Sequence, residues 1–79
     1  MYREKLLEIS NKIKEDKVLY FRLYNVLYII SFSNNEFTIR QHGLNIIHTY
    51  STLRELFNEY IIYGSALINL IDDIKYVNN

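Results

Sequence analysis

The sequence predicts an α+β fold, a small single domain over residues 1–79 with elements in the order α-β-β-β-(β)-α-α. Two observations lead to it. Three consecutive runs rich in β-branched and aromatic residues are separated by two-residue turn signals, which predicts a three-stranded antiparallel meander. Helical spacing of apolar residues before and after these runs predicts helices packed against the sheet.

The first helix is expected over residues 3–15 and to end at Asp16-Lys17. Charged residues fill one side of this segment, and apolar residues recur three or four positions apart on the other. These apolar residues are Tyr2, Leu6, Ile9 and Ile13.

The three strands are expected at Val18–Leu23, Val26–Phe32 and Glu36–Gln41. Tyr24-Asn25 and Asn34-Asn35 separate them, and asparagine tolerates the positive φ that two-residue hairpin turns require. The third strand is expected to close at His42-Gly43, and residues 44–50 are either a fourth short strand or an extended connector.

Side-chain alternation assigns the two faces of the sheet, because successive residues of a strand point to opposite sides. Polar residues identify one face as exposed. The exposed face is expected to hold Tyr20, Arg22, Tyr24, Leu27, Ile29, Ser31, Ser33, Thr38, Arg40 and His42. The buried face is expected to hold Leu19, Phe21, Leu23, Tyr28, Ile30, Phe32, Phe37 and Ile39.

Two helices are expected after residue 51. Thr52 and Glu55 have the spacing of a capping box, which predicts a helix start at this point. Gly64 interrupts the helical pattern, and Ser65 is expected to cap a last helix. The apolar side of that last helix would carry Leu67, Leu70, Ile71 and Ile74.

No catalytic, cofactor or metal site is expected, so the chain is not predicted to be an enzyme. It has no cysteine, and His42 and His48 have no carboxylate between them. Asp72-Asp73 point in different directions on a helix, and Gly64-Ser65 lacks the rest of a phosphate loop. The two histidines are therefore interpreted as a turn residue and a strand-end residue. Asp72-Asp73 are interpreted as exposed charges on a helix, and Gly64-Ser65 as helix-capping residues.

Charge and hydropathy limit the partners further. Nine basic and nine acidic residues give a formal net charge of zero, which argues against a general nucleic-acid binder. The sequence shows neither a secretory signal nor an apolar run of the roughly 20 residues that span a bilayer. The expected protein is soluble and cytoplasmic.

The expected partner-binding residues are Tyr20, Arg22, Tyr24, Leu27, Ile29, Arg40 and His42. Three uses of this face remain open: it is covered by a helix or a second copy, it binds another protein, or it binds single-stranded RNA. A homodimer is expected because a short chain that is 49% hydrophobic, without disulfides, gains stability from a partner.

The stretches Thr49–Phe57, Tyr60–Leu67 and Ile71–Ile74 resemble the ends of small proteins from AT-rich bacteria and their phages. The order of elements is similar to that of a small phage inhibitor of CRISPR nucleases. That inhibitor is strongly acidic, whereas this chain is neutral, and no functional residue is carried over. The resemblance implies a phage or mobile-element accessory protein that inhibits a host protein, such as a defence nuclease, by occluding it.

Overall fold

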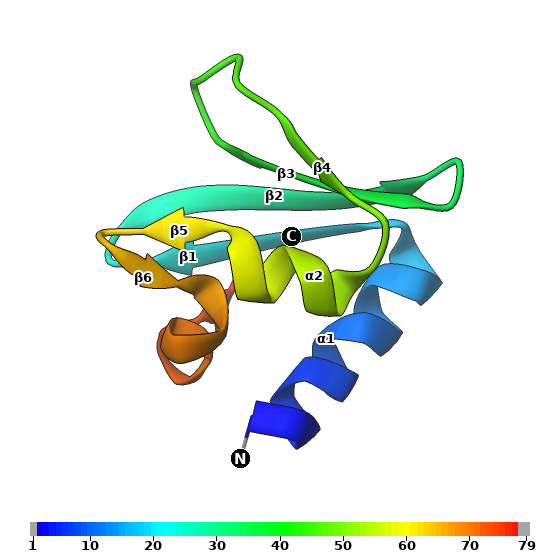
Figure 1. Cartoon of the computed structure of the whole chain (residues 1–79), viewed down its shortest axis with the longest axis horizontal. Helices are drawn as coiled ribbons and strands as arrows, with labels where there is room; N and C mark the ends of the chain where they lie inside the picture. Colours follow the sequence, from blue (N-terminus) through cyan, green and yellow to red (C-terminus); the bar gives the residue numbers. More distant parts are fainter. Residues whose placement is uncertain (1, 78–79) are drawn as a thin grey trace.

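The computed structural model describes the backbone of residues 2–77 and the side chains of residues 4–77. It confirms the α+β class, with helices packed against an antiparallel sheet (Figure 1). The elements are α1 (Tyr2–Asp16), β1 (Val18–Leu23), β2 (Val26–Ser33), β3 (Glu36–Gln41), β4 (His48–Tyr50), α2 (Leu53–Glu59), β5 (Ile61–Ile62), β6 (Ser65–Ala66), η1 (Leu67–Asp73) and β7 (Lys75–Tyr76).

The main sheet has five antiparallel strands in the order β4-β3-β2-β1-β7. Its centre is the predicted meander, which is confirmed. Residues 44–50 divide into a connector and the short strand β4. The fifth strand, β7, was not predicted, so the three-stranded sheet is corrected to five strands. β7 pairs with β1 through only two residue pairs, too few for alternation to be visible in the sequence.

Two-residue turns join β1 to β2 and β2 to β3. All four turn residues, Tyr24-Asn25 and Asn34-Asn35, have φ values between 52° and 66°. This left-handed geometry matches the twist of the flanking strands, which is why such turns connect hairpins. Both predicted turns are therefore confirmed, although Tyr24 is an unusual residue type at such a position.

All helices lie on one side of the sheet (Figure 1). The side chains between the two layers form one apolar core, and the predicted buried face contributes to it as expected. The core is formed by Ile9, Ile13, Leu19, Phe21, Leu23, Tyr28, Ile30, Phe37, Ile39, Leu53, Leu56, Phe57, Ile62, Leu67, Ile71 and Ile74. Phe32 is half-buried and packs against its margin.

The predicted start of α2 is confirmed in atomic detail. The Glu55 backbone N–H donates to Thr52 Oγ1 at 3.1 Å, and the Ser51 N–H donates to Glu55 Oε1 at 3.2 Å. The two side chains thus satisfy backbone donors that have no partner within the helix.

Thr52→Ala should lower the free energy of unfolding by about 1 kcal/mol, because it removes this acceptor. Urea unfolding followed by circular dichroism measures the change. Thr52→Ser, which keeps the hydroxyl, should retain most of the stability. Equal losses in the two variants would show that the hydroxyl does not cap the helix.

The predicted cap at Ser65 is wrong. Tyr63 and Gly64 have φ values of 52° and 79° and reverse the chain, so that β5 and β6 form a second, two-stranded hairpin. The last helix is a 3₁₀ helix, η1, which begins at Leu67 without a side-chain cap. Gly64 breaks the helical pattern because it completes a hairpin turn.

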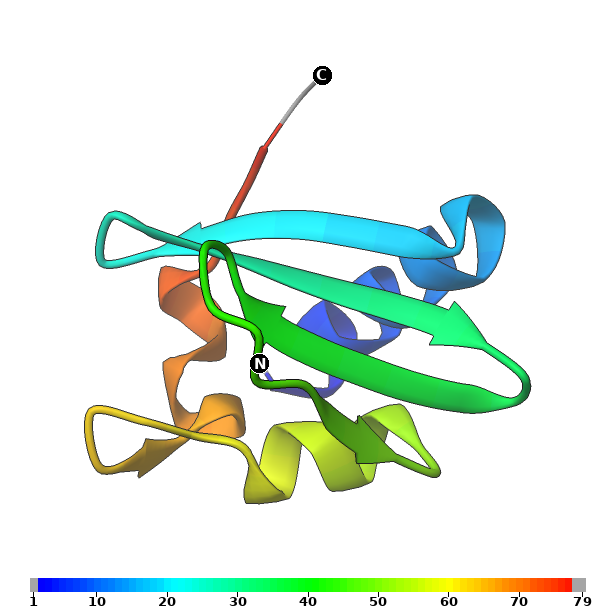
Figure 2. The ribbon, with the colours of Figure 1, turned by 90° about the horizontal axis from the view of Figure 1, so that it is seen from above.

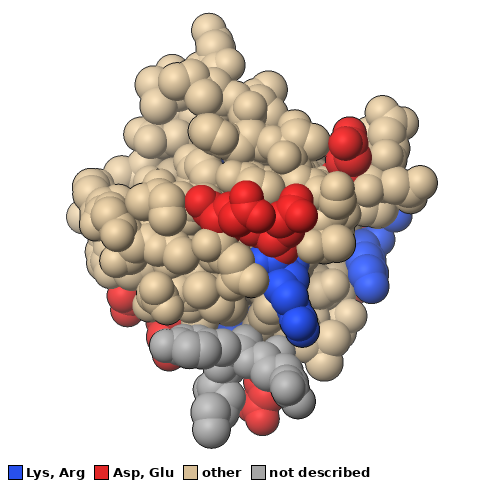
Figure 3. Space-filling view, in the orientation of Figure 1, with Lys and Arg blue, Asp and Glu red and all other residues tan. Residues whose placement is uncertain are grey.

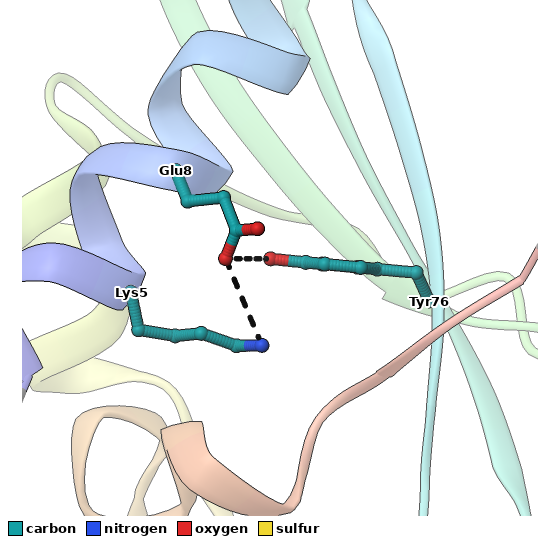
Figure 4. Close-up of polar contacts among 3 residues, drawn as sticks. All are labelled: Lys5, Glu8 and Tyr76. Carbon is teal, nitrogen blue, oxygen red and sulfur yellow. Dashed lines mark hydrogen bonds and ion pairs between the residues drawn. The ribbon is translucent and has the colours of Figure 1, made fainter.

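A polar contact joins the C-terminal strand to the N-terminal helix (Figure 4). The Tyr76 hydroxyl donates to Glu8 Oε2 at 3.1 Å, and Lys5 Nζ lies 3.8 Å from the same oxygen. The ammonium groups of Lys5 and Lys12 lie 4.7 and 4.8 Å from the centroid of the Tyr76 ring. Burial, followed by the Glu8 carboxylate, raises the pKa of Tyr76 to about 12.

This raised pKa predicts a loss of stability at high pH. A free tyrosine has a pKa of about 10, so between about pH 10 and 12 the unfolded chain loses this proton before the folded chain does. The contribution is complete below about pH 10, and the free energy of unfolding falls as pH rises through that window.

Tyr76→Phe should make this fall shallower, as measured by urea unfolding at several pH values. Glu8→Gln should keep much of the fall, because burial is the larger cause of the shift. Identical pH dependence in the wild type and Tyr76→Phe would contradict the assignment.

Candidate protein-binding surface

One face of the main sheet carries no helix. We call it the open face; it is seen from above in Figure 2, with the helices behind the sheet. No helix of residues 2–77 crosses this face, which rules out the alternative that a helix of the described residues covers it. At its centre, Ile29 is only 5% exposed. Its cross-strand partners Tyr20 and Arg40 are half-buried, and their side chains supply the cover that a helix would otherwise provide.

Five of the seven predicted binding residues share this face. The strand register places Tyr20 opposite Ile29, Arg22 opposite Leu27, and Arg40 on the other side of Ile29. Alternation therefore assigned these residues to the correct face, but Ile29 was expected to be exposed and is buried.

Tyr24 does not belong to the open face. Its hydroxyl donates to Asp73 Oδ2 at 2.8 Å, and its ring centroid lies 5.8 Å from that of Tyr63. The hydrogen bond to Asp73 is the main cause that raises the pKa of Tyr24. The prediction failed here because strand alternation does not extend into a turn with left-handed backbone.

His42 begins the loop after β3. Its backbone N–H donates to the Leu27 carbonyl at 2.8 Å, which holds the start of the loop to β2, and its side chain is exposed. His48, at the end of the same connection, packs edge-on against Tyr60 with ring centroids 5.3 Å apart. The two histidines thus have separate surroundings.

The loop between β3 and β4, residues 42–47, rises above the open face on the side away from the helices (Figure 1). Leu44, Ile46 and Ile47 are 46%, 63% and 59% exposed. No Lys, Arg, Asp or Glu occurs between Arg40 and Arg54, so this projection is uncharged in Figure 3. The run without charged residues was visible in the sequence, but the sequence did not show that the loop projects away from the sheet.

Further exposed apolar side chains lie at the same end of the molecule. Tyr24, Ile61 and Tyr63 are 50%, 57% and 72% exposed. Figures 1 and 2 both show the β1–β2 turn, the β3–β4 loop and the β5–β6 turn in the left half of the view.

Tyr24 and Tyr63 also share a strained backbone, each with φ of 52°. The left-handed conformation costs roughly 1–2 kcal/mol for a residue with a side chain. Both tyrosines are turn residues of two-residue hairpins, and the geometry of these turns accounts for their backbone conformation.

Of the cationic residues whose side chains the structure describes, three lie on the open face: Arg22, Arg40 and Lys75. Lys75, on the unpredicted strand β7, pairs directly with Arg22. The one carboxylate on the described part of this face is Glu36, which pairs with Ser33 at the opposite end of β2 from Leu27. Below the sheet, Asp72 and Asp73 share a cleft of about 320 Å³ with Arg22 and Lys75.

One exposed leucine lies elsewhere. Leu7, 61% exposed, lines a groove of about 650 Å³ between α1, α2 and η1, together with Leu53 and Ile68. Among the residues with described side chains, no group of three His, Cys, Asp or Glu is placed to hold a metal ion. Within the same part of the chain, no helix has the length and apolar character needed to cross a bilayer.

Comparison of the chain with protein-family models, with curated proteins and with solved structures gave no match.

Proposed function

We propose that this protein is a non-catalytic protein-binding module that binds its partner through the open face and the 42–47 loop. The observation that carries the proposal is the exposure of Leu44, Ile46 and Ile47 beside an uncovered sheet face. Burying apolar surface contributes about 25 cal/mol per Å², so a partner that covers this loop gains affinity from it.

The composition of the surface also supports a protein partner. Tyrosine and arginine are enriched among the residues that dominate protein interfaces, and Tyr20, Arg22 and Arg40 surround the aliphatic Leu27 and Ile29. In the role implied by the resemblance to phage and mobile-element proteins, the partner is a host protein and binding acts by occlusion.

Single-stranded RNA is the second candidate, and Lys75 beside Arg22 favours it by adding a third cation. Single-strand binding also uses successive aromatic rings as stacking platforms. Among the residues with described side chains, Tyr20 alone offers such a ring on the open face, because Tyr24 turns toward Asp73. The arrangement therefore supports a protein partner more strongly than RNA.

A labelled oligouridine should show no saturable binding even at low salt, where phosphate contacts are strongest. Fluorescence anisotropy with the wild type and Arg22→Ala measures this. Binding that weakens steeply with salt and with loss of Arg22 would make RNA the ligand instead.

Affinity capture from a lysate of the source organism tests the proposal. The wild type and Lys14→Ala, an exposed change on α1, should capture the same protein, whereas Tyr20→Ala/Arg22→Ala should not. Circular dichroism confirms that each variant is folded. Equal capture by a folded Tyr20→Ala/Arg22→Ala variant would exclude the open face as the site.

A further inference from the structure

We infer that a cleft between the β5–β6 hairpin and the neighbouring end of the main sheet binds a neutral sugar ring. The cleft is lined by residues of β2, by the last residue of β3 and by residues 60–63. Its volume of about 320 Å³ is close to the lower limit of roughly 300 Å³ for small-molecule sites. The cleft lies on the side of the sheet that carries the helices, so the inference goes beyond the proposed function and does not depend on it.

Tyr28, which lines this cleft, has an unpaired hydroxyl. The residue is only 4% exposed, and its hydroxyl forms no hydrogen bond with any of the residues whose side chains the structure describes. In the same part of the chain, no fully buried polar side-chain atom lacks a partner, so the hydroxyl opens onto the cleft. A buried tyrosine hydroxyl normally has a hydrogen-bond partner, and in this cleft the partner can be a ligand.

The polar groups of the lining favour a neutral ligand that both donates and accepts hydrogen bonds. Gln41 is directly opposite Tyr28 in the strand register, and Tyr60 and Tyr63 line a second wall. Phenol hydroxyls and a carboxamide group each provide a donor and an acceptor. None of the lining residues is Lys, Arg, Asp or Glu, so a charged ligand would lose hydration without gaining an ion pair.

A sugar ring matches this lining because its hydroxyls also donate and accept, and because they surround the ring and can reach both walls. The C–H face of the sugar is apolar, and Ile61 and the ring of Tyr63 supply apolar surface for it. A nucleobase would need aromatic faces for stacking. The Tyr60 ring is already packed against Tyr28 and His48, with centroids 6.3 and 5.3 Å apart, so it leaves less room for a base.

Titration of the whole protein with glucose, galactose and mannose at millimolar concentrations, followed by nuclear magnetic resonance, tests the inference. At least one of these sugars should shift the backbone amide signals of residues 41 and 60–63 in a saturable manner. The uronic acid of that sugar, which carries an added carboxylate, should bind more weakly because the cleft offers it no cation.

Tyr28→Phe should weaken binding of that sugar by about three- to tenfold, because it removes one hydroxyl and keeps the buried ring. Gln41→Ala, at a half-buried position, should also weaken binding and provides the test if Tyr28→Phe does not fold. Tyr50→Phe removes a hydroxyl outside the cleft and should bind the sugar as the wild type does.

The absence of saturable binding by all three sugars would overturn the inference. Unchanged affinity in folded Tyr28→Phe and Gln41→Ala, or tighter binding of the uronic acid, would also overturn it. Saturable binding of uridine but of no sugar would identify a nucleoside site instead. These outcomes leave the proposed function standing, because it concerns the opposite face of the sheet and the 42–47 loop.

Discussion

Phe21→Ala is expected to lower the free energy of unfolding by about 3–5 kcal/mol. Phe21 is fully buried and its ring stacks on Tyr28 with centroids 5.5 Å apart, so alanine leaves a cavity between the sheet and the helices. At about 0.05–0.15 kcal/mol per residue, a chain of this length is stabilised by about 4–12 kcal/mol. The variant therefore loses a large share of its stability, measurable by urea unfolding.

The next residue is a matched control. Arg22 lies on the same strand, points to the open face and is exposed, so Arg22→Ala should change the free energy of unfolding by no more than about 0.5 kcal/mol. A loss as large as that of Phe21→Ala would show that the open face is part of the core, and the proposed surface would have to be abandoned.

The second large effect is expected in binding. Ile46→Ser/Ile47→Ser should weaken affinity for the captured partner by about a hundredfold or more. Burying each isoleucine is worth about 1.5–3 kcal/mol, and 1.4 kcal/mol corresponds to a tenfold change. Stability should stay close to that of the wild type, because both side chains are mostly exposed in the free protein. Calorimetric titration and urea unfolding measure the two quantities.

Leu7→Ser is a control. It distinguishes a loss of binding through the loop from a general effect of reducing the hydrophobicity of the surface. Leu7 is as exposed as Ile46, but it lies on α1 beside the groove between the helices. This variant should retain full affinity. If Leu7→Ser abolished binding and the loop variant did not, the partner would occupy that groove and the proposed function would need a different site.

The features predicted correctly from the sequence are those that local chemistry determines. Asn34 and Asn35 tolerate the left-handed backbone of their turn, and alternation along strands of six to eight residues separates Phe21 from Arg22. Thr52 and Glu55, which form the N-terminal cap of α2, are only three positions apart in the chain. In each case, the interacting groups are close together in the chain.

The features missed depend on contacts between distant residues. Lys75 joins the open face only because β7 pairs with β1, more than fifty residues earlier in the chain. Tyr24 is in a turn to which alternation does not apply, and the Asp73 carboxylate that accepts its hydrogen bond lies 49 positions away in the chain. Helical spacing around Gly64 could not reveal a hairpin of two-residue strands. Which residues form the candidate surface is therefore determined by contacts between distant parts of the chain.

The contact of Tyr76 with Glu8 spans 68 positions of the chain and holds the shortest strand of the main sheet in place. Until residues 75 and 76 dock, the backbone of Phe21 and Arg22 lacks its outer strand and presents an edge open to other chains. A strand near the C-terminal end of the described residues thus protects one that lies more than fifty positions earlier. A chain truncated before residue 75 would keep every residue of the buried core cluster but would expose this edge to other chains.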